Sequence, residues 1–442
     1  MSAPPPEFVP GFGLYNFSVS EVHRPATREE LAALLCRLSS EGRPVVFRGA
    51  GQSYGPVNTN PAGPVVDLSR MSRVVSFDAR SGLLRAEAGA TLGDVWRLAV
   101  GDGWWPAVVT GTMKVTLGGC VAANTHGKNH WRRGSFVDHV VEVVVAGRDG
   151  AMRTIRADDP AFRSVAGAFG ATDAVVEVAL QLKRIETGFL DVEGFCLPDL
   201  AATLDCLDAR KDDREYLVAW VDCFPRGASL GRSAVHLANH AKRAAGEDGG
   251  LSVAAQEKEL PDKVAGLVPK ALVARALGLF TFDLGMRFVN LGKFLAGRAA
   301  GKHRYRQTLA GFNFLLDALP NWRNAYLPGG FIQYQLFVPK ERALAVLTEA
   351  IRLQHRLGVV SYLGVLKRHR LDPSPNGYTP DGFSLALDFP VTRANSSRLV
   401  ALCRRYDVLV REAGGRVYRA KDCVGSWERS GPPRSSCPAR TS

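Results

Sequence analysis

Two glycine-rich runs, at 48–55 and 110–130, constrain the fold of this 442-residue chain more than any other feature. The first, Arg48-Gly-Ala-Gly-Gln-Ser-Tyr-Gly55, directly follows a β-branched stretch. Glycines leave backbone N–H groups free to converge on an anion, and they allow a pyrophosphate to approach the chain closely. The third glycine comes one residue later than in the G-x-G-x-x-G fingerprint, so the run does not indicate a Rossmann fold. A plain glycine-rich turn explains this run alone equally well.

The second run interleaves glycines with small residues. The small side chains at 122–125 allow a flat ring system to lie against the backbone, and His126 and Lys128 place polar groups at its edge. Close packing of a helix on small residues is the alternative interpretation. The glycines of this run are Gly111, Gly118, Gly119 and Gly127.

From residue 17 to about 185, short β-branched runs alternate with stretches of helical periodicity, which predicts a mixed unit of strands and helices. Thr27 is the expected N-cap of the first helix. Strands are predicted at 44–48, 63–68, 83–88 and 140–146, and helices at 27–40 and 91–103.

From about residue 190 the pattern changes to longer apolar runs typical of antiparallel strands. We therefore predict an α+β protein with a domain boundary near 186–192. The glycine-containing, charged stretch 241–262 predicts a mobile loop. Strands are predicted at 216–222, 331–339 and 383–390, and helices at 341–357 and 394–413.

The net charge of +13 favours anionic partners, such as a nucleic acid, a membrane surface or a phosphorylated metabolite. The sequence contains no clustered basic motif or recognisable nucleic-acid module, so we predict no nucleic-acid partner. The eight cysteines are scattered and form no Cys-x-x-Cys pair, which argues against a zinc site or a disulfide framework, and we predict no metal. The first residues lack the features of a secretory signal, so a cytoplasmic location is expected.

The stretch 264–297 is apolar but is interrupted by charges at Lys270, Arg275, Asp283, Arg287 and Lys293. It is therefore not expected to span a membrane. Two interpretations remain: an ordinary surface helix or pair of helices over the core, or an amphipathic segment that lies on the inner face of a cell membrane.

Several motifs, in this order along the chain, carry a resemblance to a known family. They are 52–55 (Gln-Ser-Tyr-Gly), 115–119 (Val-Thr-Leu-Gly-Gly), 126–130 (His-Gly-Lys-Asn-His), 133–136 (Arg-Gly-Ser-Phe), 321–326 (Asn-Trp-Arg-Asn-Ala-Tyr), 330–335 (Gly-Phe-Ile-Gln-Tyr-Gln) and 418–422 (Tyr-Arg-Ala-Lys-Asp). Over residues 12 to 423 the chain resembles FAD-linked oxidoreductases of the vanillyl-alcohol oxidase / p-cresol methylhydroxylase (PCMH) type, and among them the decaprenylphosphoryl-β-D-ribose oxidases.

The resemblance implies a two-domain fold, with an FAD-binding PCMH-type domain and an antiparallel-sheet substrate domain. The expected parts are a flavin domain at 12–188, a substrate domain at 189–416, a return segment at 417–429 and a disordered, apparently truncated tail at 430–442. The tail is rich in proline and serine and has no hydrophobic periodicity.

The resemblance also implies which residues contact FAD. Because the first glycine run contains no histidine, unlike that of relatives with covalent flavin, we expect the FAD to be non-covalent. The expected cofactor-binding residues are Gly49, Ala50, Gly51, Gln52, Ser53, Tyr54, Gly55, Gly111, Thr116, Gly118, Gly119, Ala123, Asn124, Thr125, His126, Val175 and Tyr418.

Substrate and catalytic roles follow in the same way. Gln333 and Gln335 share one face of a strand because side chains alternate with a period of two, so both amides can reach one polyol. Lys421 is expected to act as a base or to hold a developing alkoxide. The implied catalytic residues are Lys421, Gln333, Gln335, Lys128 and Tyr54, and the implied substrate-binding residues are Trp220, Tyr326, Lys367 and Ala386.

Two local patterns leave alternatives open. The stretch 367–370 (Lys-Arg-His-Arg) forms a positive cluster that either meets a lipid phosphate or is simply solvated. His236 and His240 have the i, i+4 spacing of metal ligands, but Leu237 stands where a zinc protease needs glutamate, so we predict that they are structural.

Three departures from the family pattern affect the expected cofactor and substrate sites. Ala386 replaces a cysteine expected beside the flavin, and Ser384 replaces a nearby asparagine. Asp173 stands where glycine is expected, so an acid there is predicted to disfavour the diphosphate or to strain a turn that requires positive φ. The altered end after Asp422 is expected to weaken FAD affinity or stability.

The predicted function is oxidation of a secondary alcohol of a sugar-like substrate by hydride transfer to FAD. The resemblance implies the 2-hydroxyl of a polyprenyl-phosphoryl-β-D-ribose in cell-wall arabinose precursor synthesis, with a separate short-chain reductase as partner. A soluble aldonolactone or alditol oxidase and a flavin-binding protein without turnover remain as alternatives. The sequence does not identify the electron acceptor or the oligomeric state.

Overall fold

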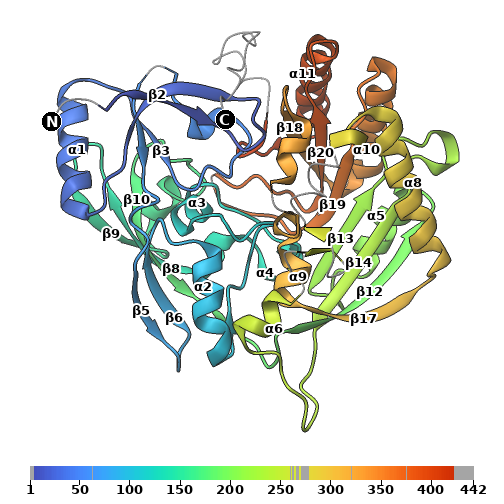
Figure 1. Cartoon of the computed structure of the whole chain (residues 1–442), viewed down its shortest axis with the longest axis horizontal. Helices are drawn as coiled ribbons and strands as arrows, with labels where there is room; N and C mark the ends of the chain where they lie inside the picture. The colour runs from blue at the N-terminus through green and yellow to red at the C-terminus, as the bar shows by residue number, and fades with distance from the viewer. Residues whose placement is uncertain are drawn as a thin grey trace.

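Two sheets form the N-terminal half of the protein (Figure 1). The four-stranded sheet has the order β1 (Pro6–Pro10), β2 (Phe17–His23), β4 (Val65–Asp67) and β3 (Val46–Arg48). The antiparallel five-stranded sheet has the order β5 (Val74–Asp78), β6 (Leu83–Glu87), β10 (Ala174–Gln181), β8 (Val140–Ala146) and β9 (Met152–Arg156). A short pair, β7 (Trp104–Trp105) with β11 (Lys183–Arg184), lies where this half of the chain ends.

One antiparallel eight-stranded sheet forms the C-terminal half, and its first strand in the sequence begins at Phe189. This arrangement confirms the predicted α+β fold. The strand order is β17 (His303–Thr308), β12 (Phe189–Leu197), β14 (Ser233–His240), β13 (Tyr216–Val221), β19 (Leu363–His369), β20 (Gly382–Pro390), β18 (Phe331–Pro339) and β21 (Arg416–Val417).

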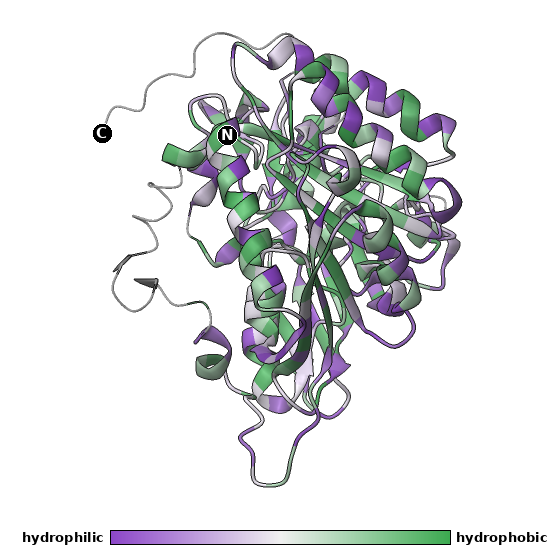
Figure 2. Cartoon of the chain, turned by 90° about the vertical axis from the view of Figure 1, so that its right-hand side faces the viewer, coloured by the Kyte–Doolittle hydropathy of each residue, from purple (hydrophilic) through white to green (hydrophobic). Residues whose placement is uncertain are grey.

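Helices cover both faces of the large sheet. The helices α5 (Leu200–Ala209), α10 (Lys340–Leu357) and α11 (Ser396–Glu412) pack on one face. On the other face α8 (Asp283–Ala299) lies on β12 and β14. Figure 2 shows largely hydrophobic strands inside and helices that carry both hydrophobic and hydrophilic residues, as expected for helices between a core and solvent. The remaining α-helices are α1 (Arg28–Ser40), α2 (Leu92–Ala99), α3 (Leu117–Ala122), α4 (His130–Arg133), α6 (Val253–Glu257) and α9 (Leu309–Asn313).

Side-chain caps explain where the predicted helices of the N-terminal half begin. The Thr27 hydroxyl accepts a hydrogen bond from the Glu30 N–H at 3.2 Å, which confirms Thr27 as the N-cap of α1. At the start of α2, Thr91 and Asp94 form a reciprocal capping box.

The two halves share a hydrophobic core rather than meeting across a polar linker. Trp105 of β7 packs against Phe314, which follows α9, with ring centroids 6.0 Å apart. Leu190 of β12 and Tyr216 of β13 are buried in the same cluster. The relative position of the two halves is therefore fixed by apolar packing.

A short segment at 418–422 joins the large sheet to the first glycine run. The Tyr54 N–H donates to the Ala420 carbonyl at 3.0 Å. Asp422 exchanges two hydrogen bonds with Gln333 of β18, both 2.9 Å long, and accepts a third from the Asn16 side chain at 2.5 Å. This segment therefore connects residues from both ends of the chain.

The structure corrects one sequence-based prediction. The predicted loop 241–262 contains α6, in which the buried Gln256 donates to the carbonyls of Gly188 and Gly250. These bonds hold the segment against the core, so the loop prediction was wrong for this part. In the stretch 264–297 the described helix is α8, and Lys270 and Arg275 lie outside the described residues.

The computed structural model describes most of the chain. Residues 423–442, which include the predicted tail, are outside the described part. The described residues are 4–422 except 62, 259, 261, 262, 265–267, 270–277, 320 and 375.

The contacts of Asp422 predict a specific pH dependence of stability. Burial raises the pKa of its carboxyl from 3.8 to about 7. Between these values the folded state holds a proton that the unfolded state has lost, so this group makes the free energy of unfolding fall as pH rises from about 4 to about 7. In Asp422→Asn the free energy of unfolding should therefore fall less than in the wild type over this pH range. Urea unfolding at a series of pH values measures the difference.

The exposed Asp205 of α5 offers a control for that measurement. Asp205→Asn should retain the wild-type dependence. If the free energy of unfolding varied with pH in the same way in Asp422→Asn and the wild type, the pH dependence would not come from Asp422.

Candidate active site

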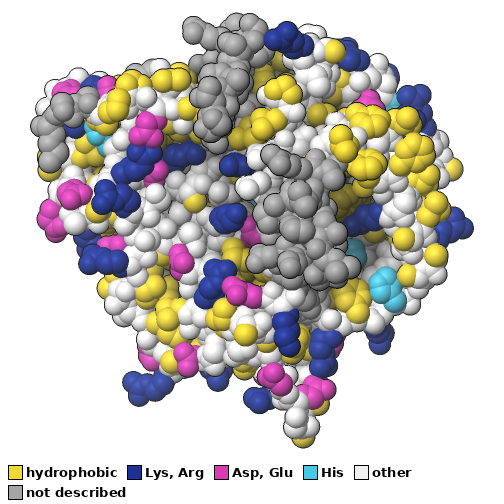
Figure 3. All heavy atoms as spheres, viewed as in Figure 1, with side chains coloured by type: hydrophobic (Ala, Val, Ile, Leu, Met, Phe, Trp, Pro, Cys, Tyr) yellow, Lys and Arg dark blue, Asp and Glu magenta, His cyan; other side chains and the backbone are white. Residues whose placement is uncertain are grey.

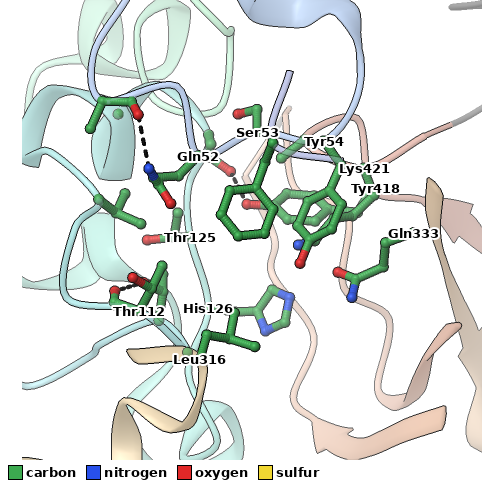
Figure 4. Close-up of a pocket in the computed structure, with 18 of the residues that line it drawn as sticks. Gln52, Ser53, Tyr54, Thr112, Thr125, His126, Leu316, Gln333, Tyr418 and Lys421 are labelled. Carbon is green, nitrogen blue, oxygen red and sulfur yellow. Dashed lines mark hydrogen bonds between the residues drawn. The ribbon is translucent and has the colours of Figure 1, made fainter. Parts of the chain in front are cut away.

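A cavity of about 450 Å³ lies between the two halves of the protein and is lined by both. Its size is within the range of about 300–1,000 Å³ that is common for ligand sites. Figure 4 shows Gln333 and Lys421 at one end, Gln52, Thr112 and Thr125 at the other, and His126 between them.

The structure brings most of the predicted site residues to this cavity. Three of the predicted site residues do not line the cavity, although the structure describes them: Gly55, Asn124 and Tyr326. The lining residues among those predicted are Gly49, Ala50, Gly51, Gln52, Ser53, Tyr54, Gly111, Thr116, Gly118, Gly119, Ala123, Thr125, His126, Lys128, Val175, Trp220, Gln333, Gln335, Lys367, Ala386, Tyr418 and Lys421.

The first glycine run forms one wall, and its glycines are required by close approach. A Cβ atom on Gly49 would lie 2.2 Å from the Thr116 hydroxyl oxygen, so any larger residue would displace the second run. Gly51 has a φ of +66°, which glycine adopts readily. Both glycines line the cavity and present no side chain to it.

The second run continues this wall. Thr116 caps α3 by accepting a hydrogen bond from the Gly119 N–H at 3.2 Å, and Gly118 packs on Ala88 too closely for a side chain. Several buried polar atoms of the cavity walls have no hydrogen-bond partner among the described residues. They are Gln52 Oε1, Asn58 Oδ1, Thr125 Oγ1 and His126 Nδ1. A ligand with many polar atoms would satisfy them.

The cavity face of the large sheet forms the opposite wall. Trp220, Val365, Ala386 and Gln335 are aligned across four neighbouring strands, and each lines the cavity. On the next cavity-facing row Asp388 lies opposite Gln333 and accepts a hydrogen bond from its amide. The alternation therefore places both predicted glutamines on one face.

Two buried ionisable groups, Lys421 and Asp388, line the cavity beside these glutamines. Lys421 lies over the Tyr54 ring, with Nζ 3.8 Å from the centroid. Burial lowers the pKa of Lys421, an effect that the nearby Asp388 opposes. Burial also raises the pKa of Asp388. Both groups are therefore poised to exchange protons near neutral pH.

A chain of hydrogen bonds links Gln335 to two buried histidines. Its amide nitrogen lies 3.2 Å from His126 Nε2 and 3.2 Å from the Ser384 hydroxyl, which in turn lies 2.7 Å from His369 Nε2. Burial lowers the pKa of both imidazoles, so they are neutral at physiological pH. Ser384, noted as a departure from the family pattern, thus orients Gln335.

The predicted positive cluster 367–370 is divided by the fold. Lys367 lines the cavity, whereas Arg368 is buried in ion pairs with Asp208 and Asp381, each 2.7 Å long. Arg370 pairs with Asp138 at 2.8 Å. The four residues therefore do not act as one cluster, because alternate residues of β19 point to opposite faces, and Arg368 and His369 are buried rather than solvated.

Asp388, His236 and Lys293 are among the lining residues that were not predicted as site residues from the sequence. Asp388 follows Ala386 by two positions on a predicted strand, so the period of two could have identified it. His236, predicted to be structural, lines the cavity and lies 3.1 Å from the Tyr305 hydroxyl. Lys293 of α8 lies over the Trp220 ring at 3.9 Å. No local sequence signal places α8 beside this strand.

Other residues occupy positions different from those expected. Tyr326 stacks on Phe331 at 4.5 Å in an aromatic cluster behind Tyr54. Asp173 pairs with Arg153 at 2.8 Å and has no positive φ, so the predicted strain is absent at this residue. Its charge is partly compensated within the wall of the cavity.

No group of three or more side chains suited to hold a metal ion occurs among the described residues. Within the same part of the chain, no helix combines the length and apolar character needed to cross a bilayer.

Comparison with known proteins is consistent with this geometry. The FAD binding domain family model matches residues 19–156. Decaprenylphosphoryl-β-D-ribose oxidase of Mycolicibacterium smegmatis is 30% identical over 424 residues, which cover 93% of this chain and 88% of that protein. A protein from the mprA 5′ region of Streptomyces coelicolor is 32% identical over 342 residues, 75% of this chain and 89% of that protein.

A more distant relative is alditol oxidase of a Streptomyces species. It is 26% identical over 172 residues, which cover 39% of this chain and 40% of that protein. The motif-based resemblance is therefore confirmed by similarity over most of the chain. The chain belongs to the FAD-linked oxidoreductase family that includes decaprenylphosphoryl-β-D-ribose oxidase, and it is an FAD-dependent oxidoreductase.

Proposed function

We propose that this enzyme oxidises a secondary alcohol of a sugar-like substrate, namely the 2-hydroxyl of a polyprenyl-phosphoryl-β-D-ribose used in cell-wall arabinose precursor synthesis. The observation that carries the proposal is the cluster of Gln333, Gln335, Asp388 and Lys421 at one end of the cavity. Two amides, a carboxyl and an amine can hold several hydroxyls of one sugar. The name of the relative from Mycolicibacterium smegmatis supports this substrate class.

The two glycine runs fit FAD. The backbone at Gly49 and Gly51, which line the cavity without a side chain, suits the pyrophosphate, and the unpartnered Gln52, Thr125 and His126 atoms suit the polar edges of the cofactor. No cysteine is among the described residues that line the cavity, and the first glycine run has no histidine. These features support FAD that is bound without a covalent link.

Bound FAD supplies the acceptor for a hydride that leaves the carbinol carbon of the substrate. The chain contributes orientation and proton transfer. Gln333 and Gln335 hold neighbouring hydroxyls, and Asp388 and Ser384 fix the two amides. The neutral Lys421 amine accepts the hydroxyl proton, and the nearby Asp388 carboxylate stabilises the ammonium ion that forms.

A soluble alditol or aldonolactone oxidase is the second candidate function. The relative that is an alditol oxidase favours it, although the match covers less than half of either chain. Such an enzyme would reduce its flavin with free sugars and would not require a lipid. The two candidates therefore differ in the substrate that reduces the flavin.

We also propose that α8 rests on an anionic membrane, where a lipid-linked substrate and a partner reductase would meet the enzyme. Leu284, Phe288 and Leu295 of this helix are exposed, and the basic Arg287 and Arg298 lie among them. Figure 3 shows hydrophobic side chains gathered over α8 at the right of the molecule. This combination is typical of helices that bind to a bilayer surface.

The cofactor assignment predicts the effect of a single methyl group. Gly49→Ala should force the first glycine run away from Thr116 and weaken FAD binding by about tenfold or more, since overpacking costs about 1–3 kcal/mol. Fluorescence titration of apoprotein with FAD would measure this. Acid precipitation of the wild type should release all flavin into the supernatant.

Gly101→Ala is the matched control, because a Cβ atom there meets nothing within 4 Å. It should bind FAD like the wild type. Equal affinities for Gly49→Ala and Gly101→Ala, or flavin that stays with the precipitate, would contradict the assignment.

The role of Lys421 predicts a pH profile. Because the neutral amine accepts the proton, kcat/KM should rise with pH as Lys421 deprotonates, below the ordinary lysine range. Lys421→Arg keeps the charge and cannot lose it, so kcat should fall by about 100-fold or more and this rise should disappear. Lys340→Met, at an exposed position on α10, should retain the wild-type profile. An unchanged rise in Lys421→Arg would assign the proton transfer to another group.

The membrane proposal predicts vesicle binding through α8. Phe288→Ser should weaken binding to vesicles that contain an anionic phospholipid by about tenfold or more, because about 1.5–3 kcal/mol of side-chain burial is lost. The exposed Leu344 of α10 provides the control, and Leu344→Ser should bind like the wild type. Sedimentation with vesicles measures both variants, and equal binding would exclude this surface.

A further inference from the structure

The amide of Gln335 is held by buried polar groups, two of which lie outside the cavity. Its nitrogen lies 3.2 Å from the Ser384 hydroxyl oxygen and 3.2 Å from His126 Nε2. Ser384 and His369 continue this chain of hydrogen bonds, and both are fully buried and absent from the cavity lining. The position of an amide that faces the cavity therefore depends on residues that do not.

Strand register explains how His369 reaches this chain. On the cavity face of the sheet, Lys367 of β19 lies opposite Ser384 of β20, and His369 lies opposite Gly382, one row further along. The imidazole is thus on the same face as Lys367 but beyond the end of the cavity. A diagonal contact of 2.7 Å joins its Nε2 atom to the Ser384 hydroxyl.

The hydrogens of the chain follow from the atoms that it joins. The Gln335 amide nitrogen donates to Ser384, so the single hydroxyl hydrogen of Ser384 is left to donate to His369 Nε2. His369 Nδ1 has no partner among the described residues, so the Nε2 contact alone determines which ring nitrogen holds the proton. His369 is therefore expected as the neutral tautomer with its proton on Nδ1.

The surroundings of His369 keep its imidazole neutral. Burial lowers its pKa well below the ordinary histidine value, and the nearby His130, His126, Lys367 and Arg368 lower it further. The ring centroids of His130 and His126 lie 4.7 Å and 5.1 Å from that of His369. Because an imidazolium could not accept the hydroxyl hydrogen, the low pKa preserves the acceptor at physiological pH.

The same bonds determine which end of the Gln335 amide faces the cavity. His126 Nε2 accepts the second amide hydrogen, so the protein itself uses both hydrogens of the nitrogen. The amide carbonyl oxygen accepts no hydrogen bond from the described residues and is left for a ligand. A hydroxyl group that meets Gln335 would therefore donate its hydrogen to this oxygen.

We propose that His369 is a positioning residue for substrate oxidation, which acts through Ser384 to hold the Gln335 carbonyl oxygen toward a substrate hydroxyl. This inference rests on the proposed function, in which Gln335 binds such a hydroxyl. Without the acceptor on His369, the Ser384 hydroxyl can donate to the amide oxygen instead, and the amide would turn its nitrogen toward the cavity. The substrate would then lose the orientation that hydride transfer requires.

Flavin reduction by a short-chain polyprenyl-phosphoryl ribose, and by xylitol as an alditol, measures this role in the FAD-loaded enzyme. His369→Phe keeps an aromatic ring beside Phe337, whose centroid lies 4.9 Å away, but removes the acceptor. The rate constant of reduction should fall about tenfold to hundredfold, because a displacement of about 1 Å can cost as much. FAD affinity should remain at the wild-type value, and an unchanged rate constant would overturn the proposal.

Two further variants separate the lost acceptor from lost packing. The Oε1 atom in His369→Gln lies as many bonds from Cα as Nε2 does, so it can accept from Ser384 and should restore most of the rate. The amide in His369→Asn is one bond shorter and should not restore it. His355→Phe removes a half-buried imidazole of α10 that bonds to the Cys223 carbonyl, and it should reduce flavin like the wild type. Equal rates in the Gln and Asn variants would contradict the role of the acceptor.

A double-mutant cycle tests whether His369 acts through Ser384. Ser384→Ala alone should lower the rate constant of flavin reduction about as much as His369→Phe does. In the Ser384→Ala background, His369→Phe should change the rate by no more than about twofold, because the intermediate hydroxyl is already absent. Losses that multiply in the double variant would show that His369 supports the fold rather than Gln335, and would overturn the proposal.

Nitrogen NMR of the holoenzyme with ¹⁵N-labelled histidine examines the chain without turnover. The signals of His369 are those that disappear in His369→Gln, and we expect a protonated Nδ1 and an unprotonated Nε2. A protonated Nε2 would overturn the proposal, because Ser384 would then accept from His369 and donate to the Gln335 oxygen. The expected tautomer in an enzyme whose flavin no sugar reduces would disprove the proposed oxidation and still support the hydrogen-bond chain.

Discussion

The hydrogen bonds of Asp422 hold together the parts of the protein on which the cavity depends. The carboxylate and backbone of this residue bind Gln333 of the large sheet, and its second oxygen binds Asn16 near the N-terminal sheet. The adjacent Ala420 accepts from Tyr54 in the first glycine run. Lys421 is thereby fixed between the two walls, so a single short segment positions the proposed base relative to both the glycine run and the glutamines.

The walls of the cavity differ in chemical character, and this difference gives the site a direction. The glycine runs offer backbone and small side chains, which suit a large cofactor. The sheet offers the amides of Gln333 and Gln335 and the carboxyl group of Asp388, which suit a substrate with several hydroxyls.

The sequence predicted well those residues that lie close together along the chain. Spacing marked both glycine runs as candidates, strand alternation placed Gln333 and Gln335 on one face, and the family resemblance supplied their expected roles. Lys293 and His236 were missed because their position depends on how α8 and β14 pack, and no local pattern encodes that packing. Tyr326 was misplaced for a similar reason, since stacking on Phe331 draws it away from the cavity.

The bond between Asn16 and Asp422 joins residues that are 406 positions apart. At a translation rate of about 5–20 residues per second, roughly 20–80 s pass between the synthesis of the two partners. The first glycine run is therefore synthesised well before the segment that carries Lys421 and binds to it. The reactive centre can be completed only once residue 422 has been made, so the enzyme cannot become competent before then.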